Sequence, residues 1–335
     1  MASYAAAYAN PQGPGDARPT ALQIVKDEKV EGKLAGKVII ITGTSSGIGI
    51  ETARALSATG ATLFLTARDL NKAEEALAGI LEPPRVTLVQ IDNTSLDSVR
   101  LGAKSILEKA HGQVNILINN AGVMAVPELQ FTKDGHEMHF GTNHLAHFLL
   151  FQLLKPALLE SSTPEFHSRV VALASCAHRV FQINDSGNYN FEKGGYESWV
   201  AYGQSKSANI YMANEIDRRY GNKGLHATSL HPAAVSTQLG KYMDPTVVAE
   251  FFQDSARVNI LENAEQGAAT TVMAAVGKEW ENRGGRYLVN CAEAERGEDD
   301  GDIAGLTYVS HTYHPKNEAR LWNDSLKMVR LTDDL

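Results

Sequence analysis

Several features that would define a special class of protein are missing from this sequence. Among 335 residues there are two cysteines, Cys176 and Cys291, and no C-x-x-C pair. We therefore expect neither a disulfide framework nor a zinc site, and reduced thiols in a cytoplasmic protein. No other grouping of histidine or acidic residues has the spacing of metal ligands, so we predict that no metal is bound.

The sequence also lacks a long apolar run and an excess of positive charge. No window reaches about eighteen consecutive apolar residues, so no transmembrane span is expected. Residues 1–19 do not combine a basic segment with an apolar one, as a signal peptide would. The net charge is -8 and no basic stripe stands out, which argues against a nucleic-acid partner.

What the sequence does contain is a regular alternation of strand and helix patterns. Short apolar runs typical of strands buried on both faces alternate with helical patterns, which predicts an α/β protein with one doubly wound parallel sheet. Its strands, about seven in number, are expected at residues 38–41, 62–66, 86–91, 114–118, 169–173, 225–230 and 286–289. Between them we expect helices, including long ones at residues 136–159 and 199–220.

No linker divides the chain into two domains. We interpret residues 1–35 as a partly flexible N-terminal extension in which Thr20 caps a short helix. Residues 36–335 are predicted to form a single domain that ends in a helical tail around residues 317–329.

A glycine-rich turn follows the first predicted strand. The segment TGTSSGIG, residues 42–49, lies between an apolar strand and a helical pattern. Glycines at such a turn let the backbone approach a pyrophosphate, and the helix N-terminus offers free N–H donors. A glycine-rich turn without a ligand is the alternative, which the strand–turn–helix context disfavours.

Tyr202 and Lys206 lie four positions apart on a predicted helix and hence on one face. A nearby ammonium stabilises a phenolate and lowers the phenol pKa, so Tyr202 can act as a general acid or base. An amphipathic helix with one half-buried Tyr and one solvated Lys is the alternative.

Ser175 and Asn143 are two further candidates. Ser175 follows a predicted strand, at the sheet edge where ligands bind in open α/β folds, although a serine there can equally form a turn. Asn143 is a poor helix former within the predicted helix at 136–159, which indicates a hydrogen-bonding role. We expect the neighbouring His144 and His147 to be structural.

Together these motifs resemble the short-chain dehydrogenase/reductase family. Thr42-Gly43-x-x-x-Gly47-x-Gly49, Asn119-Asn120-Ala121-Gly122, Ser175 and Tyr202-x-x-x-Lys206 occur in the family's order, and the resemblance covers about residues 36–289. Residues 65–69, 140–148 and 175–178 and the pair Leu321-Trp322 are most similar to the retinol dehydrogenase-like and WW-domain oxidoreductase-like branch, and to fungal secondary-metabolite reductases.

The resemblance implies a Rossmann-type catalytic domain and a role for individual residues. The implied catalytic residues are Asn143, which holds a proton-relaying water, Ser175, which binds the substrate oxygen, and the pair Tyr202 and Lys206. The implied cofactor-binding residues are Gly43, Ser45, Ser46, Gly47, Ile48, Gly49, Arg68, Asp92, Asn119, Ala121, Gly122, Tyr202, Lys206, Val235 and Thr237.

Three of these positions need comment. Asp92 is expected to bond the adenine amino group, although it is also placed to help begin a helix. Val235 and Thr237 are expected near the nicotinamide carboxamide and the pyrophosphate. Before them Ala233 replaces the family's usual glycine.

Arg68 decides between the two nicotinamide cofactors. An acid after the second strand holds the ribose hydroxyl of NAD, whereas a basic residue accommodates the 2′-phosphate of NADP. Here Arg68 precedes Asp69, and the resemblance favours Arg68 as the residue that faces the ribose. We therefore predict NADP(H).

The expected reaction is carbonyl–alcohol interconversion on a medium-sized, fairly hydrophobic small molecule. Aromatic residues in the loop after Ser175 and at the next helix are candidates to wall its pocket: Tyr189, Phe191, Tyr196 and Trp199. Two alternatives stay open, namely a non-redox isomerase or cyclase and an NADP(H)-binding protein without turnover. By resemblance we also expect a homodimer or homotetramer, paired through the helices at 137–159 and 198–219.

Overall fold

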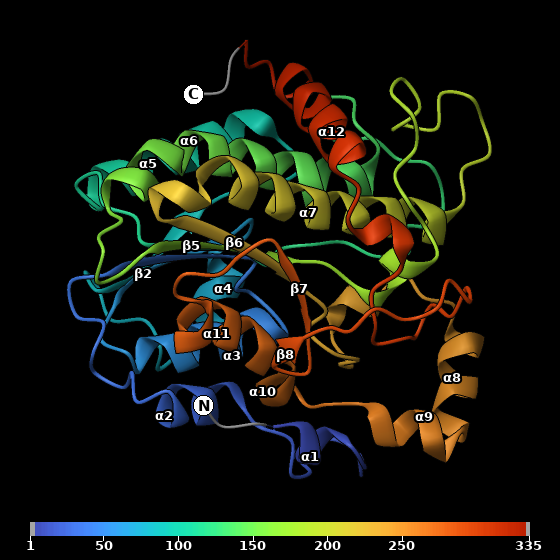
Figure 1. The fold of residues 1–335 in the computed structure, drawn as a ribbon, viewed down its shortest axis with the longest axis horizontal. Coiled ribbons are helices and arrows are strands. Elements are labelled where there is room, and N and C mark those ends of the chain that lie inside the picture. The colour runs from blue at the N-terminus through green and yellow to red at the C-terminus, as the bar shows by residue number, and fades with distance from the viewer. Residues whose placement is uncertain (1–3, 333–335) are drawn as a thin grey trace.

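The computed structural model describes residues 4–332 and shows one sheet between two layers of helices (Figure 1). The strand order is β3-β2-β1-β4-β5-β6-β7-β8, and all neighbouring pairs are parallel except β7 and β8. The strands are β1 (Val38–Thr42), β2 (Thr62–Ala67), β3 (Val86–Gln90), β4 (Ile116–Asn119), β5 (Ser168–Leu173), β6 (Leu225–Leu230), β7 (Arg286–Val289) and β8 (Ala292–Glu293). The predicted doubly wound parallel sheet is confirmed.

The eighth strand, β8, is the one element of the sheet that the sequence did not predict. It contains two residues and pairs antiparallel with β7 after a tight turn. Asn290 and Cys291 in that turn both have positive φ, at 54° and 60°. A strand this short has no apolar run of its own, so only its pairing with β7 reveals it.

The central strands are apolar throughout because helices cover both of their faces. All five residues of β1 are buried, and Ile40 packs into one hydrophobic cluster while Ile39 and Ile41 pack into another. Successive side chains of a strand point to opposite faces, so a strand buried on both sides shows no polar alternation.

Two helical layers supply these clusters. One consists of α5 (Leu96–Lys109), α6 (Ala146–Glu160) and α7 (Ser198–Tyr220), with α12 (Pro315–Met328) packed on its outside. The other consists of α3 (Ile48–Ser57) and α11 (Ala269–Val276), with α2 (Ala21–Asp27) outside them. The remaining α-helices are α1 (Ala5–Tyr8), α4 (Leu70–Ala76), α8 (Pro245–Gln253), α9 (Ser255–Ile260) and α10 (Ala264–Gly267).

The helix predicted at 136–159 is divided in two. Residues Phe140–Leu145 form a π-helical turn, and α6 follows it directly. The Asn143 side chain, in the middle of this turn, accepts a hydrogen bond from the Val123 amide and donates one to the Val123 carbonyl oxygen. A π-turn of this kind often marks a functional position in a helix.

The helices predicted to pair two subunits offer little exposed surface. Every residue of α7 from 201 to 216 is buried, and 11 of the 15 residues of α6 are buried. Trp322 of α12 packs edge-on against Phe148 and Phe151 of α6. The homodimer or homotetramer stays a prediction, but α12 of the same chain occupies much of the proposed pairing face.

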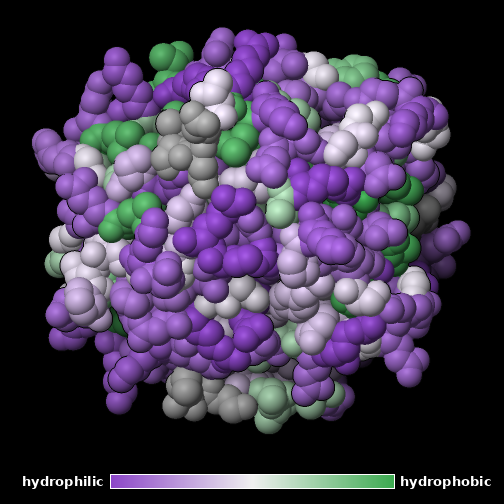
Figure 2. Space-filling model, turned by 45° about the horizontal axis from the view of Figure 1, so that its top comes forward, coloured by the Kyte–Doolittle hydropathy of each residue, from purple (hydrophilic) through white to green (hydrophobic). Residues whose placement is uncertain are grey.

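The N-terminal extension begins with residues 1–3, which lie outside the described residues, and continues along the outside of the α3–α11 layer. Thr20 caps α2, since its hydroxyl accepts a hydrogen bond from the Gln23 amide at 3.2 Å, and Ile24 and Val25 of that helix are fully buried. The face seen in Figure 2 is mainly hydrophilic, with apolar residues in small separate groups. No helix in residues 4–332 has the length and apolar character needed to cross a membrane.

Candidate active site

The glycine turn after β1 is packed so closely that two of its glycines, Gly43 and Gly49, leave no room for a side chain. A Cβ on Gly43, whose φ is +72°, would lie 2.7 Å from the Ala121 Cα. A Cβ on Gly49 would lie 2.3 Å from the Gly43 carbonyl oxygen. Gly47 has a φ of +62° and precedes α3 without a capping side chain, so the first N–H groups of that helix stay available to a ligand.

The segment after β6 lies against this turn. A Cβ on Gly47 would lie 3.2 Å from the Thr237 side chain, and one on Gly267 would lie 2.3 Å from Val235 and 3.1 Å from Ile48. The fold therefore brings Val235 and Thr237 to the start of α3, about 190 positions away in sequence. The half-buried Ser45 and Ser46 lie between the glycines of the turn.

The backbone at Ala233 has a conformation that favours glycine. Its φ is +120°, in the region that L side chains rarely adopt. Ala233, which replaces the family's usual glycine, therefore keeps a backbone conformation typical of glycine. Its Cβ makes that conformation energetically unfavourable.

Asn119 and its neighbours form the next part of the site, at the carboxyl end of β4. Asn119 is buried, and neither atom of its side-chain amide has a hydrogen-bond partner within the protein. Asn120 instead donates to the carbonyl oxygens of Thr42 and Gly43, and the Thr42 hydroxyl accepts from the amide of Ala121. An unpartnered buried amide is costly, so Asn119 is suited to bind a ligand.

The four predicted catalytic side chains come together at this edge. A Cβ on Gly122 would lie 3.2 Å from the Asn143 Oδ1 and 3.6 Å from the Lys206 Nζ, which places both groups beside Gly122. The Lys206 Nζ lies 5.6 Å from the centroid of the Tyr202 ring. The Ser175 hydroxyl is close enough to the Tyr202 phenol to lower its pKa, and both residues are buried.

Burial shifts the pKa values of the Tyr202–Lys206 pair in opposite directions. Desolvation raises the pKa of Tyr202 above its usual value, although the Ser175 hydroxyl opposes the shift. Desolvation lowers the pKa of Lys206 to about 8, while its ammonium donates to the Leu173 carbonyl oxygen at 3.1 Å. We expected the ammonium to lower the pKa of Tyr202; burial instead raises it, so the phenol is protonated at neutral pH.

His147 is a residue whose part in the site the sequence did not reveal. Its Nδ1 bonds the Asn143 carbonyl oxygen at 2.9 Å, and its Nε2 bonds the Thr42 hydroxyl at 2.9 Å. Burial lowers the pKa of His147 to about 4, so the ring is neutral. It was expected to be structural, and its structural role is to tie the π-turn to the glycine turn.

A second pair lies directly beside Ser175. The Cys176 thiol lies near His231, the residue that follows β6, and 3.9 Å from the Ser175 hydroxyl. Although burial opposes it, the imidazole lowers the pKa of this thiol, and the thiol raises the pKa of His231. Neither residue stands out by spacing, because the two are 55 positions apart.

Arg68 and Asp69 directly follow β2, and their surroundings differ. The Asp69 carboxylate accepts a hydrogen bond from the Lys72 amide at 3.1 Å and caps α4. Arg68 is exposed, and within residues 4–332 its guanidinium has no acidic partner. The Asp69 carboxylate is thus hydrogen-bonded within the protein, whereas the Arg68 guanidinium is available to a ligand.

Asp92 is already occupied by the protein. Its carboxylate accepts hydrogen bonds from the Thr94 amide and hydroxyl and from the Lys133 ammonium, the last at 2.9 Å. Despite partial burial, these contacts lower its pKa. The role that we considered as the alternative, in the turn that leads into a helix, is therefore present, and contact with an adenine remains a prediction.

The family follows from comparison with known proteins. The family model described as short chain dehydrogenase matches residues 37–247. A short-chain dehydrogenase/reductase, prx1, of Penicillium roqueforti is 48% identical over 330 residues, which cover 98% of this chain and 96% of that protein. The chain belongs to the short-chain dehydrogenase/reductase family of oxidoreductases.

Other relatives confirm the predicted branch. The human WW domain-containing oxidoreductase is 34% identical over 82% of this chain and 66% of its own length. Mouse retinol dehydrogenase 13 is 33% identical over 89% of this chain and 85% of its own length.

Solved structures confirm the fold. An uncharacterised Mycobacterium paratuberculosis protein matches with a TM-score of 0.68 and 28% identity over 94% of this chain and 98% of its own. A structure described as the Pseudomonas aeruginosa RhlG/NADP active-site complex has a TM-score of 0.62 and 23% identity over 77% of this chain and 96% of its own.

The residues at the sheet edge fit the nicotinamide dinucleotide that this family and fold imply. Gly43 and Gly49 of the glycine turn leave no room for a Cβ, the N-terminus of α3 is uncapped, and the Asn119 amide has no protein partner. Each of these features suits a polar ligand that lies directly against the backbone.

Proposed function

We propose that the protein is an NADP(H)-dependent oxidoreductase that interconverts a carbonyl and an alcohol on a medium-sized, fairly hydrophobic molecule. One observation carries the proposal. A buried phenol, with a serine hydroxyl and a buried lysine beside it, lies at the same sheet edge as a glycine turn in which Gly43 and Gly49 are packed against backbone.

The bound cofactor supplies or accepts the hydride, and the residues of the chain position the substrate and move the proton. Ser175 is placed to bond the substrate oxygen, since its hydroxyl already contacts the Tyr202 phenol. Because burial keeps Tyr202 protonated, the phenol is ready to donate its proton to a carbonyl oxygen.

Lys206 and Asn143 support the proton transfer. The Lys206 ammonium stabilises the phenolate that proton donation leaves, and at a pKa of about 8 it can also release a proton near neutral pH. The Asn143 amide is held by Val123 and by the Ser205 hydroxyl at 2.9 Å, so its place beside Gly122 and Lys206 is set by three hydrogen-bonding partner atoms.

Arg68 supports the choice of NADP(H). Its guanidinium is exposed at the end of β2, where a 2′-phosphate would lie by analogy with other dinucleotide sites, whereas Asp69 is occupied at the start of α4. The RhlG structure that shares the fold is itself described with NADP, which is compatible with this choice.

The aromatic surroundings of Tyr202 support an apolar substrate. Trp199 is half-buried and meets the Tyr202 ring edge-on at a centroid distance of 5.9 Å. The other candidates are used elsewhere: Tyr189 is buried and stacks on Phe140, Phe191 is buried, and the Tyr196 hydroxyl donates to the Val126 carbonyl oxygen. Trp199 is thus the aromatic residue that we assign to the substrate.

A screen of carbonyl compounds for NADPH consumption tests the proposal. We expect nicotinamide absorbance to fall in step with alcohol formation, and turnover with NADH to be far lower. Arg68→Ala should weaken NADPH binding by about tenfold or more and leave NADH binding unchanged.

Three outcomes would contradict the proposal. Comparable turnover with NADH would remove the assignment of Arg68. Product formation without a change in absorbance would indicate the isomerase or cyclase, and tight NADPH binding without any turnover would indicate the non-catalytic alternative.

A further inference from the structure

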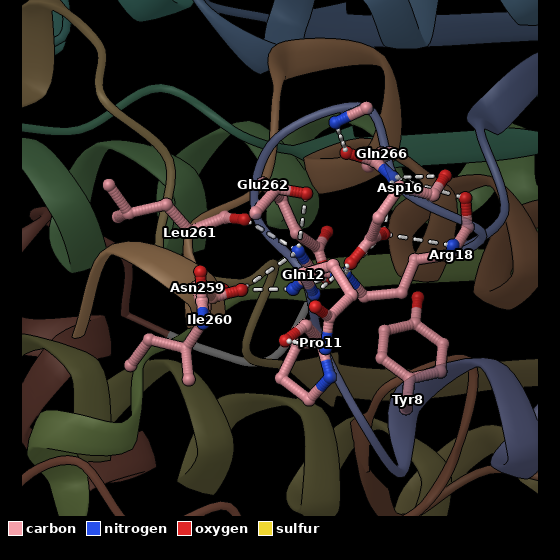
Figure 3. Close-up of polar contacts among 12 residues, drawn as sticks. Tyr8, Pro11, Gln12, Asp16, Arg18, Asn259, Ile260, Leu261, Glu262 and Gln266 are labelled. Atoms are coloured by element: carbon pink, nitrogen blue, oxygen red, sulfur yellow. Dashed lines mark hydrogen bonds and ion pairs between the residues drawn. The ribbon is translucent and has the colours of Figure 1, made fainter. Parts of the chain in front are cut away.

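A buried arginine joins the N-terminal extension to a segment near the active site. Residues 10–18, here called the N-terminal latch, lie against residues 259–266 (Figure 3). The Arg18 side chain is 3% exposed. Its guanidinium donates to the carbonyl oxygens of Asn259, Ile260 and Leu261 at 3.3, 2.9 and 2.6 Å.

These carbonyls are the ones that a helix leaves unpaired. Helix α9 ends at Ile260, and the last carbonyl oxygens of a helix have no N–H partner within it. Arg18, together with the Gly13 amide on the Asn259 carbonyl oxygen, supplies those donors from a segment more than 240 positions away in sequence. Asp16 and Glu262 balance its charge, through ion pairs of 2.8 and 3.4 Å.

Gln266 forms a second link between the same segments. Its side-chain oxygen accepts from the Gly15 amide at 2.8 Å, and its nitrogen donates to the carbonyl oxygens of Asp16 and Arg18. Gln266 is buried, and it also completes the capping box that begins α10. The latch therefore holds the chain both before Glu262, at residues 259–261, and after it, at Gln266.

The segment that the latch holds continues directly to the site. The Glu262 amide donates to the Ala234 carbonyl oxygen at 2.9 Å, and Val235 forms a parallel bridge with Glu262. Val235 in turn packs against Gly267. A Cβ on Gly267 would lie 2.3 Å from the Val235 side chain and 3.1 Å from the side chain of Ile48, at the start of α3. The chain after α9 is thus joined to the segment that carries Val235 by the Glu262 backbone and by packing against Gly267, contacts that do not involve the Arg18 side chain.

Between Thr237 and the latch the chain forms the lid, defined as residues 238–260, which contains α8 and α9. The lid stands away from the rest of the protein in Figure 1 and is mostly exposed. Its apolar side chains include four that are exposed by 37–51%, namely Leu239, Tyr242, Phe252 and Ile260. One end of the lid adjoins the glycine turn through Thr237, and the other is held by Arg18.

We propose that Arg18 is a positioning residue for substrate binding: by capping α9 it fixes the far end of the lid over the active-site edge. The inference rests on the proposed function, because it assigns the lid to the substrate of that reaction. A free end would let the lid sample many positions, so ordering it would oppose substrate binding. The cofactor-binding turn, which Arg18 does not contact, would be unaffected.

Arg169 offers a matched control for the loss of a buried guanidinium. Its side chain is also 3% exposed, donates to the carbonyl oxygens of Ala275 and Gly277 at the end of α11, and pairs with Glu281. It contacts neither the lid nor the latch. Arg18→Ala and Arg169→Ala therefore remove the same chemistry from two helix ends.

The experiment measures three quantities in the full-length variants: KM and kcat for a carbonyl substrate, NADPH affinity, and amide hydrogen exchange in the lid. For Arg18→Ala we expect KM to rise by about tenfold, lid exchange to quicken by about tenfold or more, and kcat and NADPH affinity to stay within about twofold. Arg169→Ala should change the stability but neither KM nor lid exchange.

Equal effects of the two variants on KM and lid exchange, or no effect of Arg18→Ala on either, would overturn the proposal. Where Arg18→Ala does not fold, Arg18→Lys, which keeps the charge but has fewer donors, should show the same changes to a smaller degree. Hydrogen exchange in the lid can be measured without turnover. If the wild-type protein reduces no carbonyl compound, the proposed function is refuted, but lid exchange still tests the role of the latch.

Discussion

The glycine turn and the lid lie at the same edge of the sheet, but they are held in place by different means. The turn is built from neighbours in sequence and from buried strands, and a Cβ at Gly49 would meet the backbone at 2.3 Å. The lid is mostly exposed and is fixed at its two ends, one of them through a single arginine from the N-terminal extension. The comparison indicates a preformed site for the cofactor beside a substrate site whose order depends on distant contacts.

Tyr202 lies where the two regions meet, and its removal should have the largest effect. Tyr202→Phe deletes the general acid but keeps the ring against Trp199, so kcat should fall by about a hundredfold to ten-thousandfold while NADPH affinity is retained. Steady-state kinetics and fluorescence titration measure the two quantities. Tyr211→Phe is the control, because it deletes a hydroxyl on the same helix that bonds the His311 carbonyl oxygen. Retained turnover in Tyr202→Phe would refute our catalytic assignment.

The two regions should also differ in how they tolerate an added methyl group. Gly49→Ala forces a backbone shift in the turn and should cost about 3 kcal/mol of stability or cofactor binding. In the lid, a Cβ on Gly240 meets the flexible Met243 side chain at 3.3 Å, so Gly240→Ala should change stability by less than about 0.5 kcal/mol. Urea unfolding with and without NADPH compares them. Equal costs would contradict the contrast between a rigid turn and an adaptable lid.

Substitution of Lys206 should reveal that the buried lysine lowers the stability of the cofactor-free protein. Burial lowers its pKa from 10.5 to about 8, so below pH 8 the folded protein holds an unfavourably buried charge. Lys206→Met should abolish turnover yet stabilise the cofactor-free protein at pH 7 by up to about 3 kcal/mol. The Leu173 carbonyl oxygen keeps its bond to Asn209 in that variant.

The pH dependence checks the sign of this effect. Between pH 8 and 10.5 the unfolded chain binds a proton that the folded protein does not, so the wild type gains stability as pH rises. The advantage of Lys206→Met should therefore shrink over that interval. Urea unfolding at pH 7 and pH 9.5 measures it, with the exposed Lys104→Met as the control. An advantage independent of pH would contradict burial of the charge as its cause.

The smallest effect is expected at the junction between the two regions. Ala233 has a φ of +120°, so Ala233→Gly should stabilise the protein by about 1 kcal/mol through relief of backbone strain. Ala234 does not have positive φ, so Ala234→Gly should instead destabilise by about 0.5–1 kcal/mol. Thermal unfolding distinguishes the two. Destabilisation by Ala233→Gly would show that the strain is absent in solution.

Local patterns were enough to predict the parallel sheet, the glycine turn and the Tyr202–Lys206 pair. Strands buried on both faces need apolar runs, a turn against a pyrophosphate needs glycine, and residues four apart share a helix face. These requirements involve residues that are close together in the chain, so they can be recognised from the sequence. The sequence alone therefore determined the fold class and which residues meet at the candidate site.

Only the tertiary structure decided which distant groups support that chemistry. The capping of α9 by Arg18, the bond of His147 to the Thr42 hydroxyl, and the burial that raises the pKa of Tyr202 all depend on which segments pack together. The coverage of α6 and α7 by α12 is of the same kind. Hydrogen bonds and desolvation depend on neighbours in space, and no spacing rule encodes a contact between residues more than a hundred positions apart.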